Sequence, residues 1–278
     1  MAERLKVPFG YCYLSEPPDE SLPLPDLRTT SDTPPRKPSP DFLEVLYDAL
    51  RKQDWYREYL LSEEADTVPF VGRFTTQSVM TKSTISDITN DIRNNIGLDD
   101  SLRRSAGSRD TFFSQLAKRA EKVGVIVMRS GIVGSNTHRR LDPEEFQGFG
   151  ISDSIALLIS INQNDFKSAQ VFTFAHELAH IWMGLSGVPS IQYLTRASDQ
   201  AHPDESITDA VAAEMLVPAE NFESRWYRLA NIDWDLDRLS RHYKVSMFVI
   251  LRRAFELQII SGDTLYGKIK NWLKGYLN

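Results

Sequence analysis

The segment His176-Glu177-Leu178-Ala179-His180 has the form H-E-x-x-H. On a helix, two histidines four residues apart lie on one face, so both imidazoles can reach a single metal ion. Imidazole nitrogen binds Zn²⁺ well, at about 2.0–2.1 Å. The glutamate after the first histidine points to the side of the same site, where it can accept a proton from metal-bound water without being a ligand. The segment therefore predicts a zinc site with Glu177 as its general base.

The residues around this motif favour a buried helix. Residues 168–175 contain neither proline nor glycine, and the helix can continue to Met183 before Gly184 ends it. The side chains that can bury its opposite face are Phe174, Leu178 and Ile181. The alternative is an amphipathic helix with two surface histidines. The chain has only 5 histidines and two of them are here, which favours the metal site.

A catalytic zinc site needs a third protein ligand and one open position. No histidine follows Gly184 closely, and Glu205 is the best later candidate because residues 204–216 are predicted to be a helix that carries Glu205 and Asp209 one turn apart. Glu205 would bind the metal, and Asp209 would accept the second N–H of a ligand histidine, His176, and fix its tautomer. The alternative is a solvent-facing acidic pair at a helix N-terminus, where acids are favoured in any case.

His202 lies three residues before Glu205. It is a candidate for stabilising the oxyanion of a tetrahedral intermediate. The alternative is an ordinary loop histidine, and the sequence favours that interpretation.

Composition and charge restrict the class of protein. The chain has 278 residues, a net charge of −6, 41% hydrophobic residues and 25% charged residues, which is typical of a soluble globular protein. The acidic balance argues weakly against nucleic acid as the main partner. A single cysteine excludes an intramolecular disulfide. Because the N-terminus shows no signal peptide and the apolar run 155–161 is too short to span a bilayer, we expect a cytoplasmic protein without a membrane segment.

The distribution of proline and of apolar residues predicts three regions. Residues 1–40 hold eight of the 14 prolines between Pro17 and Pro40, and we interpret them as an extended strap or linker, with a disordered leader as the alternative. Residues 41–225 are predicted to form a zincin-like domain, and residues 226–278 a C-terminal helical subdomain.

The predicted fold class is α+β, mainly helical, with a small sheet of three or more strands. We expect helices at 41–61, 83–95, 109–123 and 204–216, and strands at 125–128, 146–149 and 155–161. In the first helix, Asp41 is the expected cap, and Trp55 is expected on the buried side with Phe42. We also expect the strand at 155–161 to offer its edge to an extended peptide.

Residues 236–257 look like a helix–turn–helix with Val245-Ser246 at the turn. They gather little positive charge, so we expect a plain helical pair packed on the core rather than a DNA-reading helix.

Taken together, two segments resemble the ImmA/IrrE metallopeptidases. These carry H-E-x-x-H and then E-x-x-(A/C)-N-x-x-A-A-x-x-L-x-P, and here residues 176–180 are followed by the segment 205–218, ESITDAVAAEMLVP. The resemblance implies that His176, His180 and Glu205 bind zinc and that Glu177 is the catalytic base. Ala179 replaces the usual glycine and Asp209 the usual asparagine. The aspartate moves the pair toward the E-x-x-x-D pattern of thermolysin-like gluzincins.

The resemblance also implies a biological role. It implies a zinc-dependent endopeptidase that cleaves one regulatory, repressor-like protein, as part of a stress response. Many family members begin with a helix–turn–helix domain, whereas this sequence begins at a segment that resembles the linker after it. We therefore expect no direct binding of nucleic acid, and a DNA-binding regulator or a toxin encoded nearby as the partner. The alternative is a partner-binding module, such as the antitoxin-like subunit of a toxin–antitoxin system.

Overall fold

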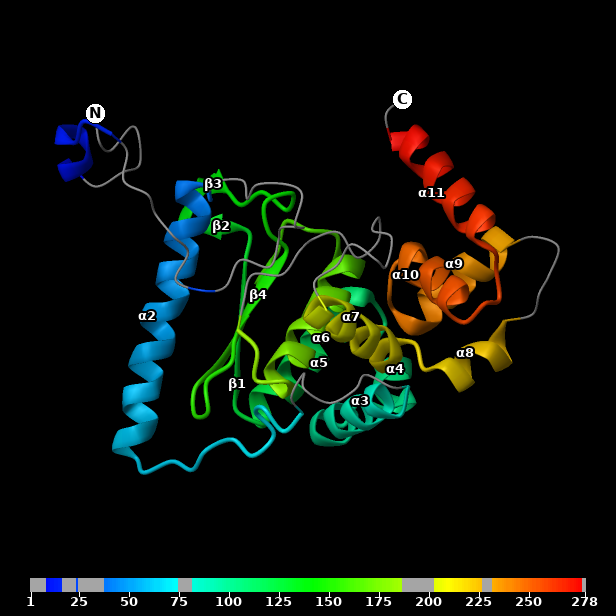
Figure 1. Cartoon of the computed structure of the whole chain (residues 1–278), viewed down its shortest axis with the longest axis horizontal. Coiled ribbons are helices and arrows are strands. Elements are labelled where there is room, and N and C mark those ends of the chain that lie inside the picture. Colours follow the sequence, from blue (N-terminus) through cyan, green and yellow to red (C-terminus); the bar gives the residue numbers. More distant parts are fainter. Residues whose placement is uncertain are drawn as a thin grey trace.

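The computed structural model describes residues 9–16, 24, 38–74, 82–186, 203–226 and 232–276, and its elements are arranged as in Figure 1. The strands are β1 (Val125–Ser130), β2 (Ile132–Val133), β3 (Asn136–Arg140), β4 (Gly148–Ile151) and β5 (Leu157–Asn162). The helices are η1 (Phe9–Tyr13), α2 (Pro40–Ser62), α3 (Lys82–Ile96), α4 (Asp100–Ser105), α5 (Arg109–Lys122), α6 (Lys167–Trp182), α7 (Pro203–Leu216), α8 (Ala219–Arg225), α9 (Ile232–Tyr243), α10 (Met247–Glu256) and α11 (Gly262–Tyr276). The fold is α+β and mostly helical.

The larger sheet has the strand order β1-β5-β4. β1 runs parallel to β5, with Val125 opposite Leu157, and β4 runs antiparallel to β5, with Gly150 opposite Ile159. Every residue of β5 is buried, as its unbroken apolar sequence predicts. The expectation that this strand offers an edge to a peptide is wrong, because β5 is the central strand and is paired on both sides. The antiparallel edge strand of the described sheet is β4.

The two faces of this sheet pack against different helices, because neighbouring side chains on a strand point to opposite faces. On β5, Leu157 and Ile159 join the main core with α5 and α6, whereas Leu158 joins a second cluster with Phe42 and Leu46 of α2. Figure 1 shows α2 standing on one side of the sheet and α5, α6 and α7 on the other. The sheet is thus sandwiched, and the H-E-x-x-H helix lies on one of its faces.

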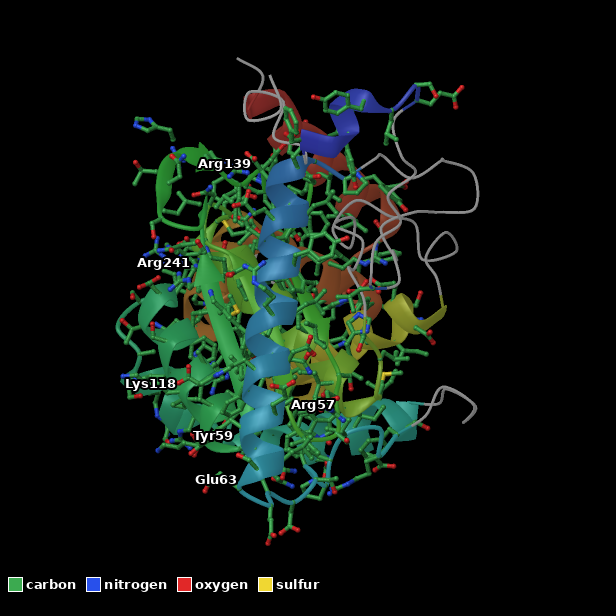
Figure 2. The ribbon with its side chains drawn as sticks, turned by 90° about the vertical axis from the view of Figure 1, so that its left-hand side faces the viewer. Arg57, Tyr59, Glu63, Lys118, Arg139 and Arg241 are labelled. Atoms are coloured by element: carbon green, nitrogen blue, oxygen red, sulfur yellow. The ribbon has the colours of Figure 1, made fainter. Side chains whose placement is uncertain are left out.

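Helix α2 differs from its prediction in two details. Its N-cap is Ser39, whose hydroxyl accepts a hydrogen bond from the Phe42 backbone N–H. Asp41 does not cap the helix, and its carboxylate instead pairs at 2.7 Å with Arg139, which Figure 2 labels near the upper end of α2. Trp55 is 68% exposed rather than buried. The buried face of α2 includes Gln53, which donates to the Ala156 carbonyl.

Most of the other predicted helices and strands occur near their expected positions. The helices expected at 83–95, 109–123 and 204–216, and the strand at 125–128, occur within a few residues of their predicted ends. The strand expected at 146–149 occurs at 148–151, and Phe146 instead packs on Phe42 with ring centroids 4.6 Å apart. Helix α4 and the β2–β3 hairpin were not expected. The division into residues 1–40, 41–225 and 226–278 stays a prediction.

Helices α9 and α10 form the pair that resembles a helix–turn–helix. Ser246 caps α10 by accepting a hydrogen bond from the Val249 N–H, and Val249, Ile250 and Leu251 belong to the main core. No residue from 247 to 255 is exposed, so α10 is packed against its neighbours along most of its length. The prediction of a helical pair packed on the core is confirmed. Among the described helices, none is both long enough and apolar enough to cross a membrane.

Candidate metal centre

Helix α6 carries both histidines and Glu177, and it is held at each end by a buried polar residue. Near its start, the Gln170 amide donates to the carbonyls of Gln163 and Asp165, and its oxygen accepts from Arg129. Near its end, Trp182 stacks on Phe70 with centroids 3.8 Å apart and donates its indole N–H to Asp91. All residues from 170 to 182 are buried. The helix is therefore fixed in position and shielded along its length.

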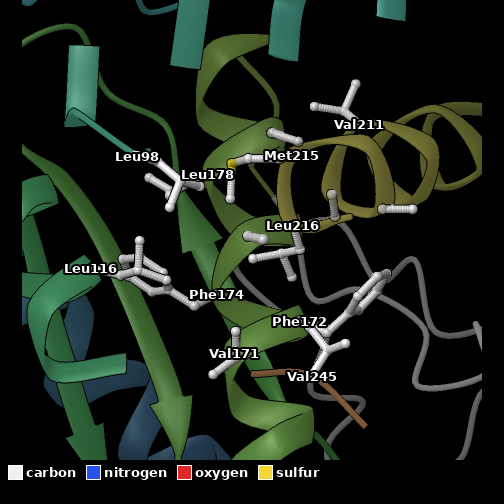
Figure 3. Packing of buried hydrophobic residues seen from close by; sticks show 14 of the residues in the cluster. Leu98, Leu116, Val171, Phe172, Phe174, Leu178, Val211, Met215, Leu216 and Val245 are labelled. Carbon is white, nitrogen blue, oxygen red and sulfur yellow. The ribbon is translucent and has the colours of Figure 1, made fainter. Parts of the chain in front are cut away.

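Helix α7 brings Glu205 and Asp209 to the same place. Its C-terminal carbonyls, those of Met215 and Leu216, accept hydrogen bonds from the buried guanidinium of Arg103. Figure 3 shows α6 and α7 side by side, with Leu178 of α6 near Met215 and Leu216 of α7. The small residues Ala212 and Ala213 are fully buried, which allows the two helices to approach closely, as their size predicts.

The structure brings the three predicted ligands together in one buried group. Nε2 of His176 lies 2.9 Å from Nε2 of His180 and 3.5 Å from Oε2 of Glu205. Nε2 of His180 lies 3.2 Å from Oε1 of Glu205. None of the three residues is more than 5% exposed. The group could hold a metal ion.

The distances between the ligand atoms fit zinc. Ligands at 2.0–2.1 Å from a tetrahedral ion are about 3.3 Å from one another. The three observed separations, 2.9, 3.2 and 3.5 Å, lie around that value. Two imidazole nitrogens and one carboxylate are also a donor set typical of catalytic zinc, which leaves a fourth position for water or substrate. The residues present therefore fit the ion that the motif predicts.

Asp209 fixes the orientation of His176. Its Oδ1 lies 2.8 Å from Nδ1 of His176. A carboxylate only accepts hydrogen bonds, so Nδ1–H is the donor, and the lone pair of Nε2 is left for a metal. This arrangement brings Asp209 to the histidine for which it was predicted.

Opposite charges lie close together in this group and shift their pKa values. Burial disfavours a charged His176, but the hydrogen bonds and charges of Asp209 and Glu205 outweigh burial and raise its pKa well above the ordinary value. Burial also favours a neutral Glu205, yet the two histidines outweigh it and hold the pKa of this carboxyl well below its usual range. Burial lowers the pKa of His180. Glu205 is thus an ionised carboxylate beside imidazole groups.

Among the described residues, Glu177 has no hydrogen-bond partner for either of its carboxylate oxygens, and Nδ1 of His180 also lacks one. Glu177 is fully buried. Burial raises its pKa from 4.5 to about 8. A buried carboxylate without a partner is costly. Within the described residues, Glu177 is therefore a buried carboxyl group with unsatisfied hydrogen-bonding capacity beside His176.

Two glycines of β4 let α6 come close to the sheet. A Cβ on Gly150 would lie 2.9 Å from Oε2 of Glu177, and a Cβ on Gly148 would lie 2.8 Å from Cγ2 of Thr173. These distances are shorter than real Cβ contacts allow. The two glycines therefore allow the edge strand to lie directly beside the carboxylate of Glu177.

The sequence and the structure agree on most of the site's membership. His176, Glu177, His180, Glu205 and Asp209 are brought together, and their chemical roles stay predictions. His202 lies outside the described residues, so its predicted role is untested. Sequence reasoning missed Gln170, Arg103 and Gly150. Only Gly150 carried a signal, because paired glycines in a buried strand indicate close approach of another backbone or side chain.

Comparison with protein-family models gives a match over part of the chain. Residues 120–255 match Peptidase_M78, the IrrE N-terminal-like domain. The match begins at the end of α5 and ends in α10, so it includes the whole three-stranded sheet, α6 and α7. A search of curated proteins finds no match to this chain.

Proposed function

We propose that this chain, which carries a domain of the ImmA/IrrE family at residues 120–255, is a zinc-dependent endopeptidase. The family supports a metallopeptidase-type function in general. One observation carries the finer proposal. His176, His180 and Glu205 converge in a buried group, and beside them stands Glu177, whose two carboxylate oxygens have no partner among the described residues. That combination is the constellation that zinc-assisted peptide hydrolysis requires.

Each residue has a distinct part in the proposed mechanism. His176, His180 and Glu205 would hold the zinc ion, which when bound supplies Lewis-acid activation of water and of the scissile carbonyl. Asp209 keeps the Nε2 lone pair of His176 available for the ion. Glu177 takes the proton of the attacking water and returns it to the leaving amine nitrogen.

The pKa of Glu177 suits this work. A general base works best when its pKa lies near the operating pH, and burial raises this one to about 8. A cation bound beside Glu177 would lower that value, because it favours the ionised carboxylate. Burial of the Glu177 carboxylate costs free energy in the metal-free protein. The same burial would allow Glu177 to accept and release a proton near neutral pH.

The proposed substrate-binding element is the outer edge of β4. Within the described residues, β4 pairs only with β5, on one side. Gly150 of β4 lies against Glu177. An extended peptide that pairs with this edge would bring its main chain past the Glu177 carboxylate. The proposed contact thus moves from β5, where the sequence suggested it, to β4.

The proposed substrate is a single regulatory protein, a repressor-like DNA-binding regulator encoded nearby. This part rests on the family resemblance. The near-complete burial of His176, Glu177, His180 and Glu205 supports it, because a closed site does not admit bulk protein and needs a partner that opens it. Cleavage would then relieve repression under stress.

The second candidate is a partner-binding module, such as the antitoxin-like subunit of a toxin–antitoxin pair. The same burial of the site favours it, because a closed site also fits a domain that binds without cutting. In that case the metal group would stabilise the fold, and the partner would be a toxin encoded nearby.

Two measurements test the proposal. Metal analysis of the purified chain should give about one zinc per molecule. Co-expression with the neighbouring gene product should give a fragment of that product, and Glu177→Gln should abolish the fragment while zinc is retained. The control is Glu63→Gln, at the exposed C-terminal end of α2 (Figure 2). A product that binds the chain but stays intact with the wild type would favour the binding module.

A further inference from the structure

A cavity of about 1070 Å³ lies between α3, α7, α8 and α10, and the mechanism uses none of its lining residues except Asp209. Asp209 lines the cavity and also bonds His176. The cavity therefore shares one residue with the metal centre. It opens to solvent, because its lining includes exposed residues such as Asn94, Ser206 and Glu220. Its size is that of a ligand site.

The lining of this cavity is acidic. Six carboxylates face three guanidinium groups; the acids are Asp99, Asp209, Glu214, Glu220, Glu223 and Glu256, and the bases are Arg93, Arg252 and Arg253. Two of the arginines are already engaged by acids of the same lining, because Arg252 pairs with Glu256 and Arg253 with Glu214. The acids outnumber the arginines, so the lining has a net negative charge, which favours a cationic ligand.

A buried hydroxyl without a partner also lines the cavity. Thr89 of α3 is only 2% exposed, and its Oγ1 has no hydrogen-bond partner within the described residues. A threonine inside a helix commonly bonds the carbonyl four residues earlier. Because the Thr89 hydroxyl does not make this bond, its hydrogen-bonding capacity is unsatisfied. A polar group of a ligand in the cavity would form a hydrogen bond with it.

Apolar side chains complete the lining. Ile85 and Leu98 are contributed from the α3 side, and Pro218 and Leu257 from the ends of α7 and α10. A small inorganic cation would gain nothing from these groups. A peptide segment with both apolar and basic side chains would use them together with the carboxylates.

We infer that this cavity is an exosite that takes a basic, partly apolar segment of the protein substrate, away from the bond that is cut. Apolar side chains of the segment would lie on Ile85 and Leu98. Its lysine or arginine side chains would face Glu220 and Glu223, and a polar group would reach Thr89. The inference rests on the proposed function, because it assumes a protein substrate.

The test uses a defined probe and the zinc-loaded full-length chain. The probe is a fluorescein-labelled helical peptide of twelve residues made of leucine and arginine, and the comparison peptide has glutamate in place of arginine. Binding is followed by fluorescence anisotropy. The paired variant Glu220→Lys with Glu223→Lys reverses two exposed charges of the cavity. The control pair, Glu58→Lys with Glu63→Lys, makes the same change on α2.

The wild type should bind the arginine peptide and not the glutamate peptide. The cavity pair should weaken binding at least tenfold, and the control pair less than twofold. Thr89→Val, which keeps the shape and removes the hydroxyl, should weaken binding severalfold. Equal losses in the two charge-reversal pairs, or displacement of the arginine peptide by equimolar spermidine, would overturn the inference, because each would mean recognition of charge alone. Equal binding of the two peptides would also overturn it, because the basic side chains would then not be recognised.

This test separates the exosite from the proposed function. If the chain cleaves its substrate but the arginine peptide binds with the same affinity to the wild type and to the cavity pair, the exosite alone is wrong. If the peptide binds as expected while no substrate is cut, the cavity remains a binding site and the peptidase proposal falls.

Discussion

Gly150 and Glu177 lie so close together that the strand position tolerates no larger residue without movement of the carboxylate. A Cβ at position 150 would be 2.9 Å from Oε2 of Glu177. The atom it meets is the end of a side chain, so Gly150→Ala should fold and shift Glu177. We expect kcat to fall at least tenfold with zinc content unchanged, since misplacement by about 1 Å can cost 100-fold.

The matched control for this glycine is Gly107→Ala. A Cβ at position 107 would meet nothing within 4 Å, so this variant should keep full activity. Both variants would be assayed for cleavage of the partner and for zinc content. If Gly150→Ala cleaves as well as Gly107→Ala, the carboxylate of Glu177 is not positioned by this strand.

Asp209 should affect zinc affinity more than it affects the fold. Its hydrogen bond to Nδ1 of His176, at 2.8 Å, orients the imidazole. Outer partners of this kind are typically worth about 10–100-fold in metal affinity. We expect Asp209→Ala to weaken zinc binding within that range. Asp209→Asn, which restores the residue usual in the family, should weaken it less.

Zinc affinity would be measured by competition with a chelator of known affinity. Asp66→Asn serves as the control, because Asp66 is exposed in the loop after α2. An Asp209→Ala chain with the zinc affinity of the control would mean that His176 is oriented without help from this carboxylate.

Local patterns in the sequence predict much of the site, because each pair of site residues lies within one helix. The four-residue spacing of His176 and His180, and of Glu205 and Asp209, fixes each pair on one helix face. Those predictions required only that α6 and α7 be helices. The sequence could not show that β4 rather than β5 is the edge strand. Strand order depends on pairing between distant segments, which no local pattern records.

Other features depend on contacts between residues far apart in the chain. Arg103 lies 112 residues from Met215, whose carbonyl it binds, and a charged side chain in a short helix gives no sign of such a role. The β2–β3 hairpin was missed because the segment 136–140, NTHRR, is polar throughout and mostly exposed. It shows no apolar alternation by which a strand could be recognised.

The stability of the metal-free protein should fall as the pH rises from about 5 to about 8. The carboxyl of Glu177 titrates near 4.5 in the unfolded chain and near 8 in the folded chain. Between these values the unfolded chain holds fewer protons, so raising the pH favours unfolding, by at most about 1.4 kcal/mol per pH unit. Glu177→Gln should remove this component, because it leaves nothing to ionise at that position.

The measurement is denaturant unfolding of chelator-treated wild type and Glu177→Gln at several pH values. The quantity of interest is the difference between the two proteins, because it cancels the titration of the other groups. That difference should grow with pH. In zinc-loaded protein it should be smaller, because a nearby cation lowers the pKa of Glu177. A difference that is constant from pH 5 to pH 8 would contradict the burial-raised pKa.

Arg103 should stabilise the fold through the end of α7. Its guanidinium donates to the carbonyls of Met215 and Leu216 and is almost fully buried, and burial lowers its pKa to about 10. Arg103→Met keeps much of the side-chain volume but leaves two buried carbonyls without these donors. We expect the free energy of unfolding to fall by about 2–4 kcal/mol. The matched control is Arg104→Met, because Arg104 is the next residue of α4 and is exposed.

Zinc links this structural role to the site. Because α7 carries Glu205, zinc binds the folded chain in preference to the unfolded chain, and excess zinc should restore part of the lost stability. Thermal unfolding with and without zinc would measure this for Arg103→Met and Arg104→Met. Arg103→Met could be destabilised and yet show no larger zinc-dependent gain in stability than a chain that lacks Glu205. In that case Arg103 stabilises α7 but does not help to position Glu205 as a ligand. Equal stability of the two arginine variants would instead show that the buried guanidinium adds nothing beyond its packing.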